Sequence, residues 1–150
     1  MRRYAGFSNA TNTVSTTVPM FTIVAATTTR GRVYDFMSGS DATPADAATK
    51  LGFRRISAAG TTASTVTPNA LDPADPAALL TYGLTWNINP TITASSEVLQ
   101  VAHNQRATFR WVAQPDGELI IPATSGAGLA LMSIVASATA NYAWTSHWLE

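Results

Sequence analysis

The segment Val98–Glu150 reads VLQVAHNQRATFRWVAQPDGELIIPATSGAGLALMSIVASATANYAWTSHWLE. Short apolar and β-branched runs alternate in it with clusters of turn residues, which lie at Asn104-Gln105, Pro115-Asp116-Gly117, Thr124–Ala127 and Ser137–Asn141. Runs of this length, repeated at roughly 8–12 residues, are typical of a β-sandwich or barrel. The segment therefore predicts strands at Val98–His103, Ala107–Ala113, Glu118–Ile121, Gly128–Val135 and Tyr142–Leu149.

The upstream half adds further strands but has less regular connections. Alternating apolar residues predict strands at Thr16–Ala26, Gly31–Met37, Lys50–Ala58 and Leu84–Ile88. Ser38–Thr49 is expected to be a loop, although Pro44–Lys50 could alternatively form one helical turn. The segment Leu71–Pro76 cannot be a regular strand because proline has no N–H to donate. About eight strands with irregular central connections predict an all-β, jelly-roll-like β-sandwich.

The length of 150 residues fits one domain, which can bury a core without disulfides. Residues 1–15 are mostly polar and show no hydrophobic period, so we expect them to form an extended N-terminal arm. Residues 16–150 then form a single β-sandwich domain. An arm of this kind can add a strand to the sheet edge of a partner, with Arg2 and Arg3 pairing with carboxylates there.

The composition favours a protein that works by contact with other proteins. Hydrophobic residues make up 46% of the chain, and charged residues only 12%, about half the share typical of soluble domains. Nine basic residues balance nine acidic ones, so no general positive field is available to bind nucleic acid. Eight of the nine basic residues are arginine, which is enriched at protein interfaces, whereas lysine is depleted there.

Residue types that carry chemistry are sparse in the sequence. The chain has no cysteine, and its two histidines, His103 and His147, have no neighbour at a metal-ligand spacing. No Gly-x-Ser-x-Gly motif occurs. We therefore predict no catalytic residue, no metal site and no cofactor. Apolar runs stay below the roughly 18 residues of a membrane span, and no signal peptide follows Met1, so no membrane partner is expected.

Aromatic residues gather in the last predicted strand. Under strict alternation Tyr142, Trp144 and Trp148 share one face of that strand, and His147 lies on the other. Two interpretations are open: the strand is central in the core, or one of its faces packs against a neighbouring subunit, where Trp and Tyr are favoured anchors. The candidate residues for contact with a partner are Arg2, Arg3, Tyr4, Tyr142, Trp144, His147 and Trp148.

The C-terminal third resembles the small decoration, or cement, proteins on the capsids of tailed bacteriophages. The segments that carry the resemblance are Asn104–Trp111, Pro115–Thr124 and the terminal strand that ends in Trp148-Leu149-Glu150. This resemblance implies a non-enzymatic, jelly-roll virion protein that is commonly a homotrimer. It would be made in the host cytoplasm and would bind the outer capsid surface, where it stabilises the shell by bridging subunits of the major capsid protein.

Two other functions are compatible with the same fold class. A receptor- or glycan-binding module of a head fibre or tail would use exposed Trp and Tyr rings to stack on sugars. A small cupin-like enzyme would need several converging metal ligands, which the two histidines do not supply.

Overall fold

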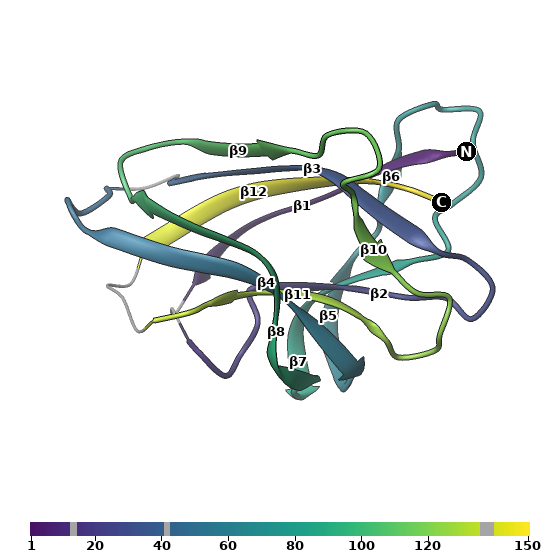
Figure 1. The fold of residues 1–150 in the computed structure, drawn as a ribbon, viewed down its shortest axis with the longest axis horizontal. Helices are drawn as coiled ribbons and strands as arrows, with labels where there is room; N and C mark the ends of the chain where they lie inside the picture. The colour runs from purple at the N-terminus through teal and green to yellow at the C-terminus, as the bar shows by residue number, and fades with distance from the viewer. Residues whose placement is uncertain (13–14, 41–42, 136–139) are drawn as a thin grey trace.

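Strands account for all the regular secondary structure in the residues that this computed structural model describes, which are 1–12, 15–40, 43–135 and 140–150 (Figure 1). No helix occurs among them. The chain is all-β, as predicted. The strands are β1 (Arg3–Asn12), β2 (Phe21–Val24), β3 (Gly31–Ser40), β4 (Ala48–Ala58), β5 (Thr61–Val66), β6 (Asn69–Ala70), β7 (Thr81–Ile88), β8 (Thr91–Asn104), β9 (Phe109–Val112), β10 (Leu119–Ile121), β11 (Gly128–Ser133) and β12 (Ala140–Leu149).

Two antiparallel sheets form the layers of a sandwich. Sheet A has the order β10-β3-β12-β1-β6, with β9 also paired to β3, and sheet B has the order β5-β7-β2-β11-β4-β8. Figure 1 shows sheet A as the upper layer, and the strands of sheet B below it. The predicted β-sandwich is therefore confirmed, and its strand order is compatible with a jelly roll.

The strands predicted from the sequence agree closely with those observed. Each of the nine predicted runs contains or overlaps a strand, and the additional strands are β1, β5 and β6. The helical turn considered at Pro44–Lys50 is wrong, because β4 already begins at Ala48. Part of the turn predicted at Ser137–Asn141 lies outside the described residues, which leave out 136–139.

The prediction of an extended N-terminal arm is wrong for Arg3–Asn12. These residues form β1, which pairs with β12 along its whole length, from Arg3 opposite Leu149 to Asn12 opposite Ala140. On its other side β1 pairs with β6 at Tyr4 and Ala5. The boundary predicted at residue 15 therefore does not separate an arm from the sandwich, because a strand beside β12 supplies hydrogen bonds that β12 would otherwise lack.

The core lies between the sheets and is built around aromatic rings. Phe21 of β2 stacks on Tyr82 with their centroids 4.8 Å apart, and its ring also lies near Phe36, Phe53 and Trp144 at 6.2, 5.8 and 5.7 Å. Because these rings come from both sheets, Phe21 joins the two layers. Burial of these large side chains is the main force that holds the sheets together.

The two ends of the chain are tied to each other and to the loop before β7. The backbone N–H groups of Arg2 and Glu150 each donate to the other residue's carbonyl at 3.0 Å. The Glu150 carboxylate accepts hydrogen bonds from the N–H groups of Leu79 and Leu80 and from Nε1 of Trp148, at 2.8, 3.0 and 3.0 Å. These contacts fix the last strand at the end of the sandwich.

Candidate functional site

The outer face of sheet A is the surface best suited to contact another molecule. In β12 the side chains of Tyr142, Trp144, Ser146 and Trp148 are buried, so the alternate residues face outward. The strand registers place outward-facing residues in two rows that run across β1, β12, β3 and β9. One row contains Phe7, Thr145, Met37 and Arg110, and the next contains Ala5, His147, Asp35 and Val112.

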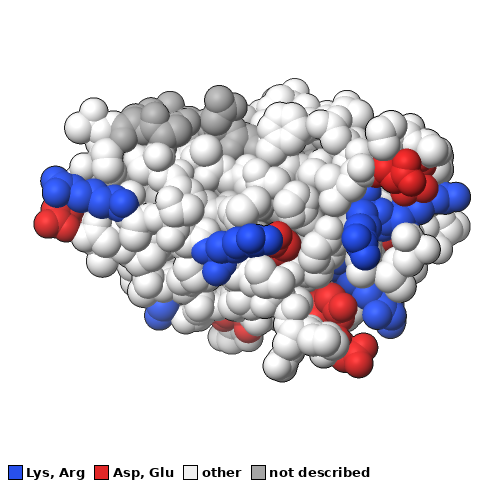
Figure 2. All heavy atoms as spheres, turned by 90° about the horizontal axis from the view of Figure 1, so that it is seen from above, with Lys and Arg blue, Asp and Glu red and all other residues white. Residues whose placement is uncertain are grey.

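Exposed apolar groups and shallow depressions characterise this face. Phe7 is 45% exposed and Val112 is 55% exposed, which is high for side chains of their kind. One depression of about 510 Å³ is lined by Phe7, Met37 and Thr145, and a second of about 430 Å³ by Arg3, Tyr34 and Leu149, among others. Figure 2, seen from above, shows charged side chains in a few separate groups with broad uncharged surface between them.

A network centred on Asp35 braces the middle of the face. The buried carboxylate of Asp35 accepts hydrogen bonds from Nε and an Nη nitrogen of Arg110, at 3.1 and 2.7 Å. Nδ1 of His147 lies 3.3 Å from the same carboxylate, and the ring of Tyr34 stacks on the His147 ring with centroids 6.0 Å apart. Three strands, β3, β9 and β12, are therefore joined at one carboxyl group.

This arrangement stabilises the charged form of Asp35. The hydrogen bonds from Arg110 hold the pKa of the Asp35 carboxyl below its usual range, and the contact with His147 acts in the same direction. Burial raises the pKa of the neighbouring Tyr34 hydroxyl. The negative charge of Asp35 is thus balanced by Arg110 within the protein. The guanidinium of Arg110 is still partly exposed, so it can also contact another molecule.

We expect Asp35→Asn to lower the free energy of unfolding by about 1–2 kcal/mol at pH 7, because the amide loses charged hydrogen bonds to Arg110 and His147. The difference should shrink as the pH falls below the ordinary aspartate value of about 4, where the unfolded chain takes up a proton first, and it is lost once the pH passes the lowered pKa of the folded carboxyl. Urea unfolding at several pH values measures both effects.

The matched control is Asp116→Asn, the same chemical change at an exposed turn residue with φ of 62°. Asn tolerates this backbone conformation, so its stability should stay close to that of the wild type. Equal effects of the two substitutions at pH 7 would show that the Asp35 network does not stabilise the sandwich.

The structure separates the candidate contact residues into two groups. Tyr4, Tyr142, Trp144 and Trp148 are at most 2% exposed and belong to the core, so the contact prediction is wrong for them and the core interpretation of the last strand holds. The remaining candidates are Arg2, Arg3 and His147, which lie at or near the surface.

The three candidates near the surface do not form one cluster. Arg2 lies 3.7 Å from a carboxylate oxygen of Asp75, at the end of the sandwich. Arg3 lines the second depression on the outer face of sheet A, and His147 lies in the Asp35 network on the same face. Arg3 and His147 are therefore the predicted contact residues that this face retains.

Comparison of the chain with known protein families, curated proteins and solved structures found no match.

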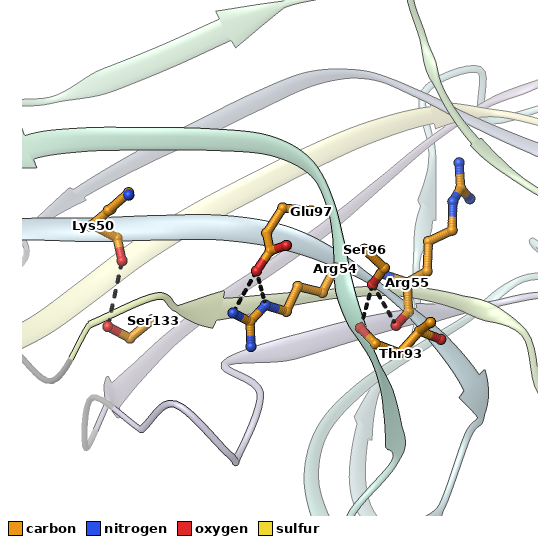
Figure 3. A network of polar contacts seen from close by, with 7 residues as sticks. All are labelled: Lys50, Arg54, Arg55, Thr93, Ser96, Glu97 and Ser133. Atoms are coloured by element: carbon orange, nitrogen blue, oxygen red, sulfur yellow. Dashed lines mark hydrogen bonds and ion pairs between the residues drawn. The ribbon is translucent and has the colours of Figure 1, made fainter.

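A second polar network lies on sheet B and has a structural role (Figure 3). It accompanies an irregularity in the pairing of β4 with β8, where Ser95 has φ of 51°. The hydroxyl of Ser96 accepts the N–H of Arg55 at 3.0 Å and donates to the carbonyl of Thr93 at 2.6 Å. Beside it, Nε of Arg54 donates to Glu97 at 2.7 Å. The two bonds of Ser96 satisfy backbone groups that the bulge leaves without ladder partners, and the Arg54–Glu97 pair links the side chains of β4 and β8 beside them.

The described part of the chain contains neither a metal-ligand cluster nor a membrane-spanning helix. There, no group of three or more His, Cys, Asp or Glu side chains is placed to hold a metal ion. No helix in the described ranges is long and apolar enough to cross a membrane.

Among the described residues, Asp35 is the one hydrogen-bonding partner of the His147 ring. The Asp35 network therefore acts as a structural brace that supports the outer face of sheet A.

Sequence analysis missed Asp35, Arg110 and Phe7 as members of this face. Under strict alternation Phe109 and Arg110 fall on opposite faces of the predicted run Ala107–Ala113, which is a usable signal for an outward arginine. No local signal joins Asp35 to Arg110, because the two lie 75 positions apart in the sequence. Their pairing follows only from the register of β3 with β9.

Proposed function

We propose that this chain is a capsid decoration protein of a tailed bacteriophage, which binds the outer capsid surface through the outer face of sheet A. In this role it bridges subunits of the major capsid protein and stabilises the shell without chemistry of its own. We further propose that it acts as a homotrimer, since symmetry multiplies moderate contacts through their effective concentration.

The observation that carries the proposal is the outer face of sheet A itself. It is broad, it exposes the apolar side chains of Phe7 and Val112, and its depressions are shallow. The Asp35 network holds the exposed guanidinium of Arg110 in place, on the same strand as Val112. Apolar anchors next to a preorganised arginine favour binding to a protein surface.

The glycan-binding alternative has less support. Sugar stacking needs exposed aromatic rings, and the aromatic residues of the last strand, Tyr142, Trp144 and Trp148, are core residues. Of the aromatic side chains that the structure describes, only Phe7 is largely exposed.

The test is co-sedimentation with capsids assembled from the major capsid protein of the same genome. We expect the wild-type chain to pellet with the capsids and to elute alone with about three times the mass of one 15.8 kDa chain. Val112→Asp and Phe7→Asp should each weaken binding about tenfold or more, because each places a charge at an apolar contact.

Ile88→Asp is the matched control. Ile88 is 65% exposed and belongs to β7 of sheet B, so this substitution should leave capsid binding unchanged. A wild-type chain that does not bind capsids would overturn the proposed function. Binding that is weakened by Ile88→Asp, but not by the changes at Phe7 and Val112, would overturn the choice of face.

A further inference from the structure

Both histidines of the chain lie beside the same short strand, β9. This strand covers the edge of β3 over four pairs, from Asp35 opposite Val112 to Ser38 opposite Phe109. The ring of His103 stacks on the ring of Phe109, with centroids 6.0 Å apart and an interplanar angle of 22°. On the other face of the strand, His147 contacts the carboxylate that holds Arg110.

His103 occupies a site that suits only its neutral form. Both of its ring nitrogens are sealed from solvent and have no hydrogen-bond partner. The ring lies between Phe109 of β9 and Tyr142 of β12, whose centroid is 5.9 Å away. Tyr142 donates its hydroxyl proton to Thr49, the β4 residue opposite His103, at 2.8 Å.

Protonation of His103 would create a buried charge with nothing to balance it. The imidazolium has two N–H donors, and the groups that face it are two aromatic rings and a threonine whose hydroxyl accepts from Tyr142. Burial alone accounts for the lowered pKa of His103, with no contribution from a charged group. The proton is therefore taken up most readily when the contact with Phe109 opens and water reaches the ring.

The ion pair on the opposite face of β9 is not itself broken by protonation over the same pH range. Asp35 faces Arg110 from β9, His147 from β12 and the ring of Tyr34, and its pKa is lowered mainly by Arg110. Asp35 therefore stays charged over the range in which histidines titrate. The pair is nevertheless a weak restraint, because the side chain of Arg110 is 59% exposed and such pairs are screened by water and salt.

We propose that β9 is an acid-released strand: protonation of His103 frees β9 from the edge of β3 while the rest of the sandwich stays folded. Its four pairs with β3 compare with ten that join β1 to β12, so β9 can open at a much smaller loss of structure than the central strands of sheet A. Release exposes the backbone N–H and C=O groups of Asp35–Ser38, an edge to which another strand can pair. This inference goes beyond the proposed function and does not depend on it.

Amide hydrogen exchange between pH 7.5 and 4.5, corrected for the intrinsic pH dependence of exchange, tests the proposal. For a lowered His103 pKa, the closed form has its full stability above the ordinary value of about 6.5 and loses it as the pH falls below that value. We expect the opening constant of the β9 amides to rise by up to about tenfold per pH unit below 6.5. The amides that join β1 to β12 should keep their protection.

Two variants separate the histidines. In His103→Phe the ring that stacks on Phe109 is retained without a titrating group, so the acid-dependent opening should disappear. In His147→Gln, which keeps an N–H for Asp35, the opening should persist. Unchanged protection of β9 at pH 4.5, equal loss of protection in β1 and β12, or persistent opening in His103→Phe would each overturn the proposal.

A direct titration of the wild-type protein covers the case in which His103→Phe does not fold. The ring proton resonances of His103, followed by NMR, should titrate below the ordinary histidine range while β9 is closed. Titration at or above that range would overturn the proposal without any variant.

Discussion

Phe21→Ala is expected to lower the free energy of unfolding by about 3–5 kcal/mol, the range found when a large buried aromatic side chain is truncated. Phe21 is fully buried, and its ring contacts four other aromatic rings from both sheets. Alanine leaves a cavity between the sheets that the surrounding rings can fill only in part. A loss of this size is a large part of the stability of a domain with a single core.

Urea unfolding followed by circular dichroism measures this effect, and Phe7→Ala is its matched control. Phe7 is 45% exposed on the outer face of sheet A, so the same truncation there should change the free energy of unfolding much less. If Phe21→Ala were no more destabilising than Phe7→Ala, the aromatic cluster would not be what joins the two sheets.

Gly128→Ala is expected to destabilise the fold by about 3 kcal/mol or more, at or beyond the usual range for overpacking. Gly128 lies at the start of β11, between Val24 of β2 and Ile56 of β4. A Cβ atom there would lie 2.2 Å from the carbonyl oxygen of Ile23. This neighbour is backbone in the middle of sheet B, so the contact can be relieved only by separating β11 from β2.

Gly39→Ala provides the control, because its Cβ would meet nothing closer than the Thr108 hydroxyl at 3.4 Å. Alanine in place of glycine at such a position should change the free energy of unfolding by less than about 1 kcal/mol. Thermal unfolding of both variants measures the two losses of stability. A Gly128→Ala protein with wild-type stability would contradict the close approach of β11 and β2.

The strands that could be predicted from the sequence are those in which alternation or an apolar run is strong. Gly128–Ser133 and the alternating residues of β12 are examples, and both were placed within two residues of their observed ends. The strands that were missed, β1, β5 and β6, carry mostly polar or small residues. Thr61–Val66 is almost entirely exposed and shows no hydrophobic period, so its strand character follows only from its pairing with β7.

The candidate site was less predictable, because it depends on register. The aromatic residues of the last strand drew attention as possible anchors, but a ring that is large enough to be an interface anchor is equally suited to a core. Whether such a ring lies in the core or at an interface depends on whether the rest of the fold covers its face of the strand. The inward face of β12 is covered by sheet B, and so Trp144 and Trp148 are buried while His147 is not.

The mutual hydrogen bonds of Arg2 and Glu150 place both ends of the described chain at one pole of the molecule. A polypeptide joined to either end would leave from the same pole, well away from the loops at the opposite end of the strands. A linker of a few residues would suffice to connect the two ends, so new termini could be opened in an exposed turn such as Pro115–Gly117 without lengthening the path of the chain. The fold is thus suited to carrying an added segment on one side only.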